Sequence, residues 1–317
     1  MHMAVGFIGL GIMGSRMAAN LLRSPAPLAG RAGHSLLVHN RTRSKADSLV
    51  ANGAIWADTP AEMGRQSGIL FTMLARPEAV LETALGPEGF LCQLPAGALW
   101  VDCSTVNPSF SRRMAAEANA LGVRLVDAPV TGSKPAAQAG ELVFMVGGDP
   151  SDVEECQPYL DLMGKRTVHV GAQGMGASLK IVFNLLVAEA MLSFSEAIGL
   201  GRSLGIPRET LHDFLIGSPA VPPLIGIKRP KFESGDYEAD FPLQLMWKDL
   251  HLAALTAYEQ GAPLPAGNVA KEIYAMAVKS GLSEQDFAVL YRFMNVEDPR
   301  QGNEGPRQGV EDPGHGR

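Results

Sequence analysis

The sequence predicts an α/β fold in which a doubly wound, mostly parallel sheet is followed by an all-α helical domain. Three observations lead to this prediction. Short apolar runs alternate with helical patterns through roughly the first half of the 317 residues. A glycine-rich turn joins the first apolar run to the first helical pattern, and from about Gly176 onward only helical periodicity remains. Strands that alternate with helices form parallel sheets that carry helices on both faces.

The glycine-rich turn predicts a dinucleotide-binding site. Residues 4–8 form an apolar run that predicts a buried strand, and Gly9, Gly11 and Gly14 follow it in the spacing G-x-G-x-x-G before a helical pattern begins. Gly9 permits a tight turn, Gly11 leaves room for a pyrophosphate, and Gly14 lets the helix pack close to the strand. The helix N-terminus offers N–H groups and a partial positive charge to phosphates. A glycine-rich turn without a ligand is the alternative. The residues predicted to bind the cofactor here are Gly9, Leu10, Gly11, Ile12, Met13 and Gly14.

The end of the second predicted strand, residues 35–39, favours NADP over NAD. An acidic residue at this point would hold the ribose 2′-hydroxyl of NAD, whereas an arginine suits the 2′-phosphate of NADP. Here the chain reads Asn40, Arg41 and Thr42. Arg41 offers a planar guanidinium to the phosphate, and Asn40 adds no repelling charge. A solvated basic turn is the alternative. Residues 24–33, which separate the glycines from this strand, are predicted to form a surface loop.

The remaining strands of the sheet direct further side chains to one edge. Strands are predicted at residues 54–57, 69–74, 99–103, 124–128, 142–146 and 167–170, with helices over 44–52, from Thr59, from Pro108 and after Pro150. Ligands of open α/β sheets bind at the carboxyl ends of the strands. Met73 and Leu74 lie at such an end and are predicted to contact the cofactor.

Hydroxyl side chains follow two of these strands and predict a carboxylate-binding region. Ser104 and Thr105 follow the strand at 99–103, and Thr131, Gly132 and Ser133 follow the strand at 124–128. Hydroxyls and loop N–H groups at these points are suited to hold a substrate carboxylate. Ordinary helix capping by Ser104 or Thr105 is an equally good interpretation from spacing alone.

A long apolar helix is predicted over residues 177–203. It is apolar around most of its circumference, which predicts a buried helix, while its charged and amide side chains argue against a membrane span. Later helices are predicted from Arg208, over 243–260, from Ala266 and from Glu284. The predicted organisation is therefore a nucleotide-binding domain over 1–172, a helical domain over 173–296 and a disordered tail over 297–317.

Lys180 and Asn184, four residues apart on this helix, are the predicted catalytic residues. A buried lysine is costly unless it is used or paired. Such a lysine can protonate a carbonyl oxygen as a hydride reaches the carbon, and burial lowers its pKa towards the working range. A lysine that extends to solvent at the start of the helix is the alternative.

Composition limits the partners. The formal net charge is −6, which argues against nucleic acid or an anionic membrane as the main partner. The three cysteines are widely spaced, which favours a reducing compartment and neither a disulfide framework nor a zinc site, so no metal is predicted. Without a signal-like N-terminus, a cytoplasmic location is expected.

Several motifs together resemble the β-hydroxyacid dehydrogenases. These are the glycine turn 9–14, the segment 102–105 with Pro108, the segment 127–133, the Gly176/Lys180/Asn184 spacing, and Phe241-Pro242-Leu243 with Lys248-Asp249-Leu250. They occur in the family's order and cover nearly the whole chain to about Met294. The Asn40-Arg41-Thr42 turn is similar to the NADPH-dependent glyoxylate and succinic semialdehyde reductase branch.

The resemblance implies roles for individual residues. Lys180 would be the proton donor with Asn184 beside it, and Ser104, Thr131 and Gly132 would surround the substrate carboxylate. Lys248 would lie near the cofactor, whereas Phe241 and Asp249 would lie at the active-site wall. It also implies a helical domain that forms a homodimer or homotetramer. Thr131 and Ser133 depart from the Ser and Gly common in 3-hydroxyisobutyrate dehydrogenases, and Leu185 stands where a second Asn is common.

The prediction is an NADPH-dependent reductase of a small aldehyde or keto acid that carries a carboxylate. Three alternatives remain open from the sequence: a 3-hydroxyisobutyrate-type dehydrogenase, an imine reductase on the same fold, and a non-catalytic NADP-binding scaffold. Imine reductases usually lack a lysine at the position of Lys180, so this residue favours carbonyl chemistry.

Overall fold

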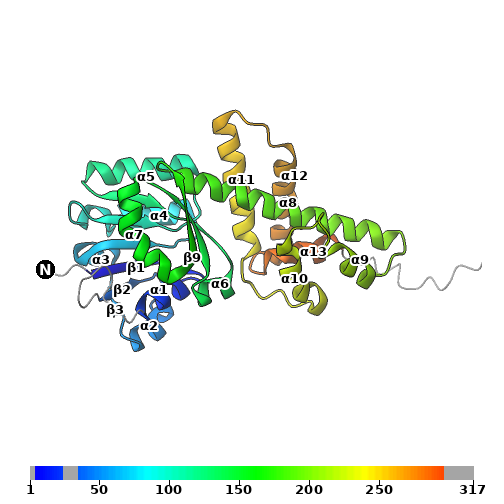
Figure 1. The fold of residues 1–317 in the computed structure, drawn as a ribbon, viewed down its shortest axis with the longest axis horizontal. Helices are drawn as coiled ribbons and strands as arrows, with labels where there is room; N and C mark the ends of the chain where they lie inside the picture. Colours follow the sequence, from blue (N-terminus) through cyan, green and yellow to red (C-terminus); the bar gives the residue numbers. More distant parts are fainter. Residues whose placement is uncertain (1–3, 24–34, 296–317) are drawn as a thin grey trace, which may run out of the picture.

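The computed structural model describes residues 4–23 and 35–295 and consists of an α/β domain and a helical domain (Figure 1). The long helix α8 (Met175–Ser203) runs from one into the other. The predicted loop at 24–33 and the predicted tail at 297–317 lie outside the described residues.

The sheet is mostly parallel, as predicted. Its strands are β1 (Ala4–Ile8), β2 (Leu36–His39), β3 (Ile55–Trp56), β4 (Ser67–Thr72), β5 (Leu99–Asp102), β6 (Arg124–Asp127), β7 (Val130–Thr131), β8 (Leu142–Gly147) and β9 (Gly164–Gly171). Their order is β3-β2-β1-β4-β5-β6-β8-β7, with β9 beside β8. The strands from β3 to β6 are parallel, whereas β8 pairs antiparallel with β6 and β7. Because β2 and β4 lie on opposite sides of β1, the strand order reverses at β1, where ligands of such sheets bind.

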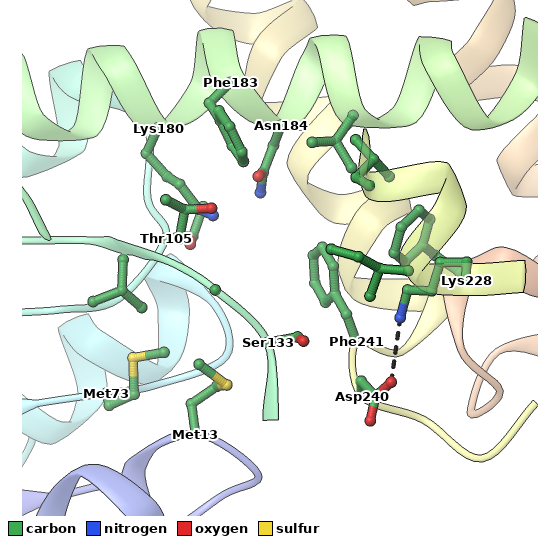
Figure 2. Close-up of a pocket in the computed structure, with 17 residues that line it drawn as sticks. Met13, Met73, Thr105, Ser133, Lys180, Phe183, Asn184, Lys228, Asp240 and Phe241 are labelled. Carbon is green, nitrogen blue, oxygen red and sulfur yellow. Dashed lines mark hydrogen bonds and ion pairs between the residues drawn. The ribbon is translucent and has the colours of Figure 1, made fainter. Parts of the chain in front are cut away.

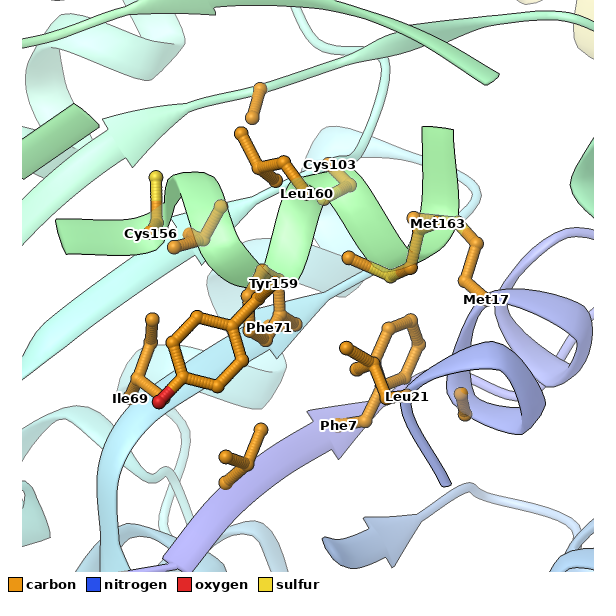
Figure 3. Packing of buried hydrophobic residues seen from close by; sticks show 14 of the residues in the cluster. Phe7, Met17, Leu21, Ile69, Phe71, Cys103, Cys156, Tyr159, Leu160 and Met163 are labelled. Carbon is orange, nitrogen blue, oxygen red and sulfur yellow. The ribbon is translucent and has the colours of Figure 1, made fainter. Parts of the chain in front are cut away.

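Helices cover both faces of this sheet. They are α1 (Gly14–Leu22), α2 (Asp47–Ala51), α3 (Pro60–Gln66), α4 (Pro77–Leu85), α5 (Pro108–Ala120), α6 (Lys134–Ala139) and α7 (Pro150–Met163). Successive residues of a strand face opposite sides. Phe7 accordingly packs in one apolar layer with Met17 and Tyr159, whereas Ile8 packs in the other with Trp100 (Figure 3 shows the first layer).

The helix α8 contacts both domains along its length. Its first part packs against β8 and β9, and its later part packs in the core of the helical domain. By length and composition it is the one helix among the described residues that could cross a membrane, but half of its apolar window is buried inside the protein. The prediction of a buried helix is correct only in part, because Val182 and Leu186 are 55% and 63% exposed.

The helical domain differs from the prediction in two places. It contains α9 (Arg208–Leu215), α10 (Pro223–Ser234), α11 (Leu243–Gln260), α12 (Pro265–Ala277), a π-helical turn η4 (Val278–Leu282), a 3-10 turn η5 (Phe287–Val289) and α13 (Leu290–Met294). The prediction omitted α10, because Pro222, Pro223 and Pro230 conceal it, although Pro223 occupies the first helical position, where proline is tolerated. The helix predicted from Glu284 is wrong at its start. Asp286 is extended and its side chain accepts a hydrogen bond from the Ala288 N–H, so η5 begins after it.

Smaller differences occur in the α/β domain. The predicted helix over 44–52 is divided into a 3-10 turn η2 (Arg43–Ala46) and α2. The short elements β7 and α6 were not predicted either. They follow the Pro129 turn and bring the 131–133 segment to the carboxyl edge of the sheet, where it faces the helical domain.

Candidate active site

A cavity of about 350 Å³ lies between the carboxyl edge of the sheet and the helical domain (Figure 2). Residues from both domains line it, so neither domain alone forms it. Nine of the predicted site residues line this cavity: Met13, Met73, Thr105, Thr131, Gly132, Ser133, Lys180, Asn184 and Phe241. These residues are dispersed over more than 220 positions of sequence, from Met13 to Phe241, and the fold brings them together.

The glycine turn has the geometry that a dinucleotide requires. Gly9 has a φ of +100°, and a Cβ there would collide with the Met73 carbonyl oxygen. A Cβ on Gly14 would collide with the Gly9 carbonyl oxygen, so both positions require glycine. Gly11 is different, because it is exposed and a Cβ there would meet nothing within 4 Å. Open space therefore lies beside Gly11, where the backbone can approach a pyrophosphate. The described residues thus fit the diphosphate of a nicotinamide dinucleotide.

The three residues after β2 have different roles. The Asn40 side chain accepts a hydrogen bond from the Leu10 N–H at 3.0 Å and donates one to the Thr42 carbonyl oxygen at 2.9 Å. It therefore ties the glycine turn to the end of β2. Arg41 is exposed and forms no hydrogen bond or ion pair with another described residue. The guanidinium of Arg43, by contrast, lies 5.3 Å from the Trp56 ring and 3.6 Å from the Asp58 carboxylate.

Ser104 lies behind the cavity wall and does not line it. Its hydroxyl accepts a hydrogen bond from the Leu74 N–H at 2.9 Å, and its N–H donates to the Asp102 carboxylate at 3.0 Å. Asp102 also accepts a hydrogen bond from the Thr72 hydroxyl, and burial raises the pKa of its carboxyl group. Ser104 therefore fixes the turn after β4, in which Met73 reaches the cavity.

The 131–133 segment faces the cavity from the end of β7. Thr131 pairs with Val143 in the sheet, and Gly132 adopts a φ of +109°. The Ser133 hydroxyl points into the open centre of the site (Figure 2). Directly after this segment, the Lys134 ammonium pairs with the Glu238 carboxylate of the helical domain at 2.8 Å. An interdomain contact therefore adjoins the predicted carboxylate loop.

Lys180 is buried in the cavity wall and forms no ion pair with any residue that the structure describes. Its side chain is 8% exposed, and its ammonium lies 5.5 Å from the centre of the Phe183 ring. No side chain in the described ranges accepts a hydrogen bond from it. Burial lowers the Lys180 pKa to about 8, because loss of hydration outweighs the attraction of Asp249. The group can therefore exchange a proton near neutral pH.

A buried chain of polar groups positions Asn184 beside Lys180. The Asn184 amide donates a hydrogen bond to the Asp249 carboxylate at 2.5 Å. Lys248 Nζ lies 2.9 Å from the other oxygen of Asp249 and donates a hydrogen bond to the Thr105 carbonyl oxygen at 2.7 Å. Asp249 and Lys248 therefore lie outside the cavity wall, and they link α11 to both α8 and the loop after β5.

Sequence reasoning missed eight residues of the cavity wall: Val130, Phe183, Val187, Leu224, Ile227, Lys228, Asp240 and Phe287. Three of them had a usable signal. Phe183 and Val187 share a helix face with Lys180 and Asn184, because the four residues are spaced i, i+3, i+4 and i+7. Lys228 follows the apolar run 224–227 and shares a helix face with Leu224, four residues before it. The other positions carry ordinary apolar or acidic side chains and no distinguishing pattern.

Two family models together match almost all of the described residues. Residues 4–171 match the family model described as the NAD binding domain of 6-phosphogluconate dehydrogenase. Residues 174–294 match the model described as NAD-binding of NADP-dependent 3-hydroxyisobutyrate dehydrogenase.

Individual relatives align over almost the whole chain. A chloroplastic glyoxylate/succinic semialdehyde reductase 2 of Arabidopsis thaliana is 34% identical over 298 residues, covering 94% of this chain and 81% of its own. The mitochondrial 3-hydroxyisobutyrate dehydrogenase of Mus musculus is 33% identical and covers 93% and 88%. A solved structure of Mycobacterium tuberculosis 3-hydroxyisobutyrate dehydrogenase with L-serine superposes with a TM-score of 0.81 at 28% identity, covering 93% and 99%.

Proposed function

Because the chain belongs to the β-hydroxyacid dehydrogenase family, whose members are NAD(P)-dependent oxidoreductases acting on hydroxyl or carbonyl groups, we propose that it is an NADPH-dependent reductase. Its proposed substrate is a small aldehyde or keto acid that carries a carboxylate. The observation that supports this most directly is the buried, unpaired Lys180 in a cavity that also reaches the glycine-turn side of the sheet.

The proposed chemistry assigns one task to each side of the cavity. When bound, NADPH supplies a hydride to the carbonyl carbon. Lys180 donates a proton to the carbonyl oxygen, which would otherwise become an alkoxide, and Asn184 holds the substrate oxygen beside the ammonium. Thr131, Gly132 and Ser133 bind the carboxylate through hydroxyl and N–H groups. Met13 and Met73 form an apolar wall that would hold the nicotinamide ring.

The proposed preference for NADPH rests on Arg41. Its side chain is exposed at the end of β2 and pairs with no acidic residue in the ranges 4–23 and 35–295, so it is available to a 2′-phosphate. Asn40 carries no charge that would repel that phosphate. The glyoxylate/succinic semialdehyde reductase name of the Arabidopsis relative supports the reductive assignment and the substrate class.

The test is turnover by a Lys180→Met variant, measured together with NADPH binding. The methionine keeps the length of the side chain and removes the proton, so we expect kcat for glyoxylate reduction to fall by roughly 10²–10⁴-fold while NADPH binding is retained. Lys279→Met is the matched control, because Lys279 is an exposed lysine in η4. Undiminished turnover by Lys180→Met would remove Lys180 from the mechanism.

A second candidate is a 3-hydroxyisobutyrate-type dehydrogenase that works in the oxidative direction. The name of the mouse relative favours it. The same residues would act in reverse, with neutral Lys180 accepting the hydroxyl proton. Comparison of kcat/KM for glyoxylate with NADPH and for 3-hydroxyisobutyrate with NAD⁺ separates the two candidates. Reduction of a cyclic imine is the third arm of the same assay, and NADPH binding with no turnover in any arm would favour a non-catalytic scaffold.

We also propose that the chain assembles into a homodimer or homotetramer through its helical domain. The stripe formed by Val182 and Leu186 on α8 is apolar and exposed in the single chain, and burying it against a second copy would be favourable. Light scattering of the wild type and of Leu186→Asp tests this, because a charge in the interface would lower the assembled mass. A cytoplasmic location stays a prediction from sequence.

A further inference from the structure

The cavity is polar at one end, whereas at the other end aromatic and aliphatic side chains surround one ion pair, Lys228 with Asp240 (Figure 2). Lys180, Asn184 and the 131–133 segment form the polar end. Phe241 lies across the open space from Met73 and Thr105 (Figure 2), at the end formed by the helical domain. A carbonyl and a carboxylate need only the polar end, so the apolar end has no role in the chemistry proposed above.

The apolar surface begins directly beside the proton donor. Lys180, Phe183, Asn184 and Val187 lie on one face of α8, because their spacing matches successive helical turns. The Phe183 ring is in contact with the Lys180 ammonium region, at 5.5 Å from Nζ to the ring centre. Leu224 of α10 continues the wall away from this face. A group attached next to the reacting carbon would therefore meet hydrocarbon at once.

A buried carboxylate holds the far wall in place. Asp286 is fully buried and accepts hydrogen bonds from Lys228 Nζ at 2.9 Å and from the Phe241 N–H at 3.1 Å. The rings of Phe241 and Phe287 meet edge to face with centres 5.7 Å apart. Because the aromatic wall is fixed before a ligand binds, little conformational entropy is lost when it packs against one.

The far wall offers no charge for a second anionic group. Lys228 is the cation that lines this end, and it already contacts both Asp286 and Asp240, the latter at 3.3 Å. Among the described residues, no other lysine or arginine lines the apolar end. A distal carboxylate would therefore lose hydration without gaining a partner.

We infer that the substrate carries an apolar branch, a branched-alkyl or aryl group next to the reacting centre, in addition to its carboxylate. This inference rests on the proposed function and narrows its substrate class. The chemistry is unchanged: in reduction the carbonyl carbon gains a hydride from the nicotinamide and the carbonyl oxygen gains a proton from Lys180. The cavity of about 350 Å³ must hold the nicotinamide ring beside Met13 and Met73 as well as the substrate, and the apolar branch would lie at its other end, against Leu224 and Phe241.

The experiment uses a series of stable products, assayed in the oxidative direction with NADP⁺. The series is 3-hydroxypropanoate and its 2-methyl, 2-isobutyl and 2-benzyl derivatives, which keep the carboxylate and the reacting alcohol constant. Burial of each methylene group is worth about fourfold in transition-state affinity. We therefore expect kcat/KM to rise at least roughly tenfold from the unsubstituted to the 2-isobutyl acid.

Variants locate the effect in the apolar wall. Val187→Thr has nearly the same shape and adds a hydroxyl, and Leu224→Gln places an amide in the wall. In both, the ratio of kcat/KM between the 2-isobutyl and the unsubstituted acid should fall severalfold. Leu121→Gln is the control, because Leu121 is an exposed leucine at the end of α5, and it should keep the wild-type ratio.

The outcomes distinguish failure of the apolar-branch inference from failure of the proposed function. Turnover of 3-hydroxypropanoate with kcat/KM that falls as the branch grows would overturn the apolar-branch inference and leave the proposed function standing. A rise that Val187→Thr and Leu224→Gln both preserve would also overturn it, because the wall would not be the cause. Absence of turnover for the whole series and for glyoxylate, with NADPH bound, would overturn the proposed function itself.

Discussion

The ionisation of Lys180 sets an expected pH dependence. Its pKa is lowered to about 8 by burial. In the proposed mechanism reduction requires the protonated amine of Lys180 as the acid, so kcat for reduction should be level below pH 8 and decline as pH rises through about 8. Oxidation requires the neutral amine and should rise through the same interval. Measurements of kcat in both directions from pH 6 to 10 check this, and parallel profiles in the two directions would contradict the assignment.

Arg41 and Arg43 stand two residues apart, and we expect their substitution to weaken NADPH binding to different extents. Arg41→Ala should weaken NADPH binding by roughly 10–100-fold and leave NADH binding nearly unchanged, because a charge-assisted contact to the 2′-phosphate is lost. Arg43→Ala should have a smaller effect, since Arg43 already lies against Trp56 and Asp58. Fluorescence titration measures the affinity of each variant for NADPH and for NADH. Equal losses for NADPH and NADH in Arg41→Ala would refute the phosphate contact.

Single site residues could be predicted from the sequence where a polar group would be costly to bury or where residues follow a known spacing. Lys180 and Asn184 stood out because polar groups in a buried helix need a reason, and the glycines stood out by their spacing. Leu224 and Phe287 had no such mark, since an apolar residue on a cavity wall looks the same in sequence as one in a core. Ser104 shows the opposite case. Its hydroxyl was predicted to bind the substrate carboxylate, but in the structure it accepts a hydrogen bond from the Leu74 N–H and fixes the turn after β4.

At the scale of elements, the start of α8 depends on one carboxyl group from the sheet. The two oxygens of Asp127, at the end of β6, accept hydrogen bonds from the Gly174 and Ala177 N–H groups at 2.7 Å each. These are among the N–H groups that a helix leaves unpaired at its first turn. Asp127 therefore connects the sheet to the helix that carries Lys180.

Asp127→Asn should lower the free energy of unfolding by roughly 1–3 kcal/mol, because an amide group replaces one acceptor oxygen with a donor. Burial raises the Asp127 pKa to about 7, so the folded state holds this proton more tightly than the unfolded state, whose value is near 3.8. The associated stability is present at low pH and is lost as pH rises through about 7. Denaturant unfolding at pH 5 and pH 8 should show this loss in the wild type and not in Asp127→Asn. An identical pH dependence in both proteins would exclude Asp127 as its source.

Helices and strands could be predicted where the hydrophobic periodicity and the flanking residues agreed. They were missed where prolines in the sequence contradicted the periodicity. The strands β1 and β2 and the helices α9 and α11 follow directly from periodicity and their flanking residues. The helix α10 has three prolines in or before it, which predict a break, yet Pro223 begins the helix and Pro230 lies inside it. The packing of Ile225 and Phe232 in the helical core overrides the local signal.

At the scale of the whole molecule, the cavity exists only because two domains are held together. Polar contacts join them around its rim: Lys248 with Thr105, Lys134 with Glu238, and Arg76 with Gln244 at 3.2 Å. The sequence predicted two domains and a connecting helix, since composition changes near Gly176. It did not predict how they meet, because polar contacts between residues far apart in the sequence leave no periodic pattern.

Cofactor binding should stabilise the folded chain. A ligand at 100 times its Kd adds about 2.7 kcal/mol to the free energy of unfolding. We expect this to raise the Tm by several degrees with NADPH and by less with NADH at the same concentration. Thermal unfolding followed by circular dichroism measures the shift, and Arg41→Ala should abolish the difference between the two cofactors. No shift with either cofactor would contradict a dinucleotide site at the glycine turn.

The arrangement of one face of α8 bears on how this enzyme can diversify. Residues 180 to 187 hold the proposed proton donor Lys180, its amide neighbour Asn184 and two side chains of the apolar wall within about two turns of helix. The proposed catalytic residues and two residues that contact the substrate branch therefore lie in one short segment. Substitutions at positions 183 and 187 would change the cavity wall and leave Lys180 and Asn184 in place. Exchanging those two residues alone offers a compact library for redirecting the substrate range. Inserting a single residue before Lys180 would instead rotate the whole set by about 100° away from the cavity.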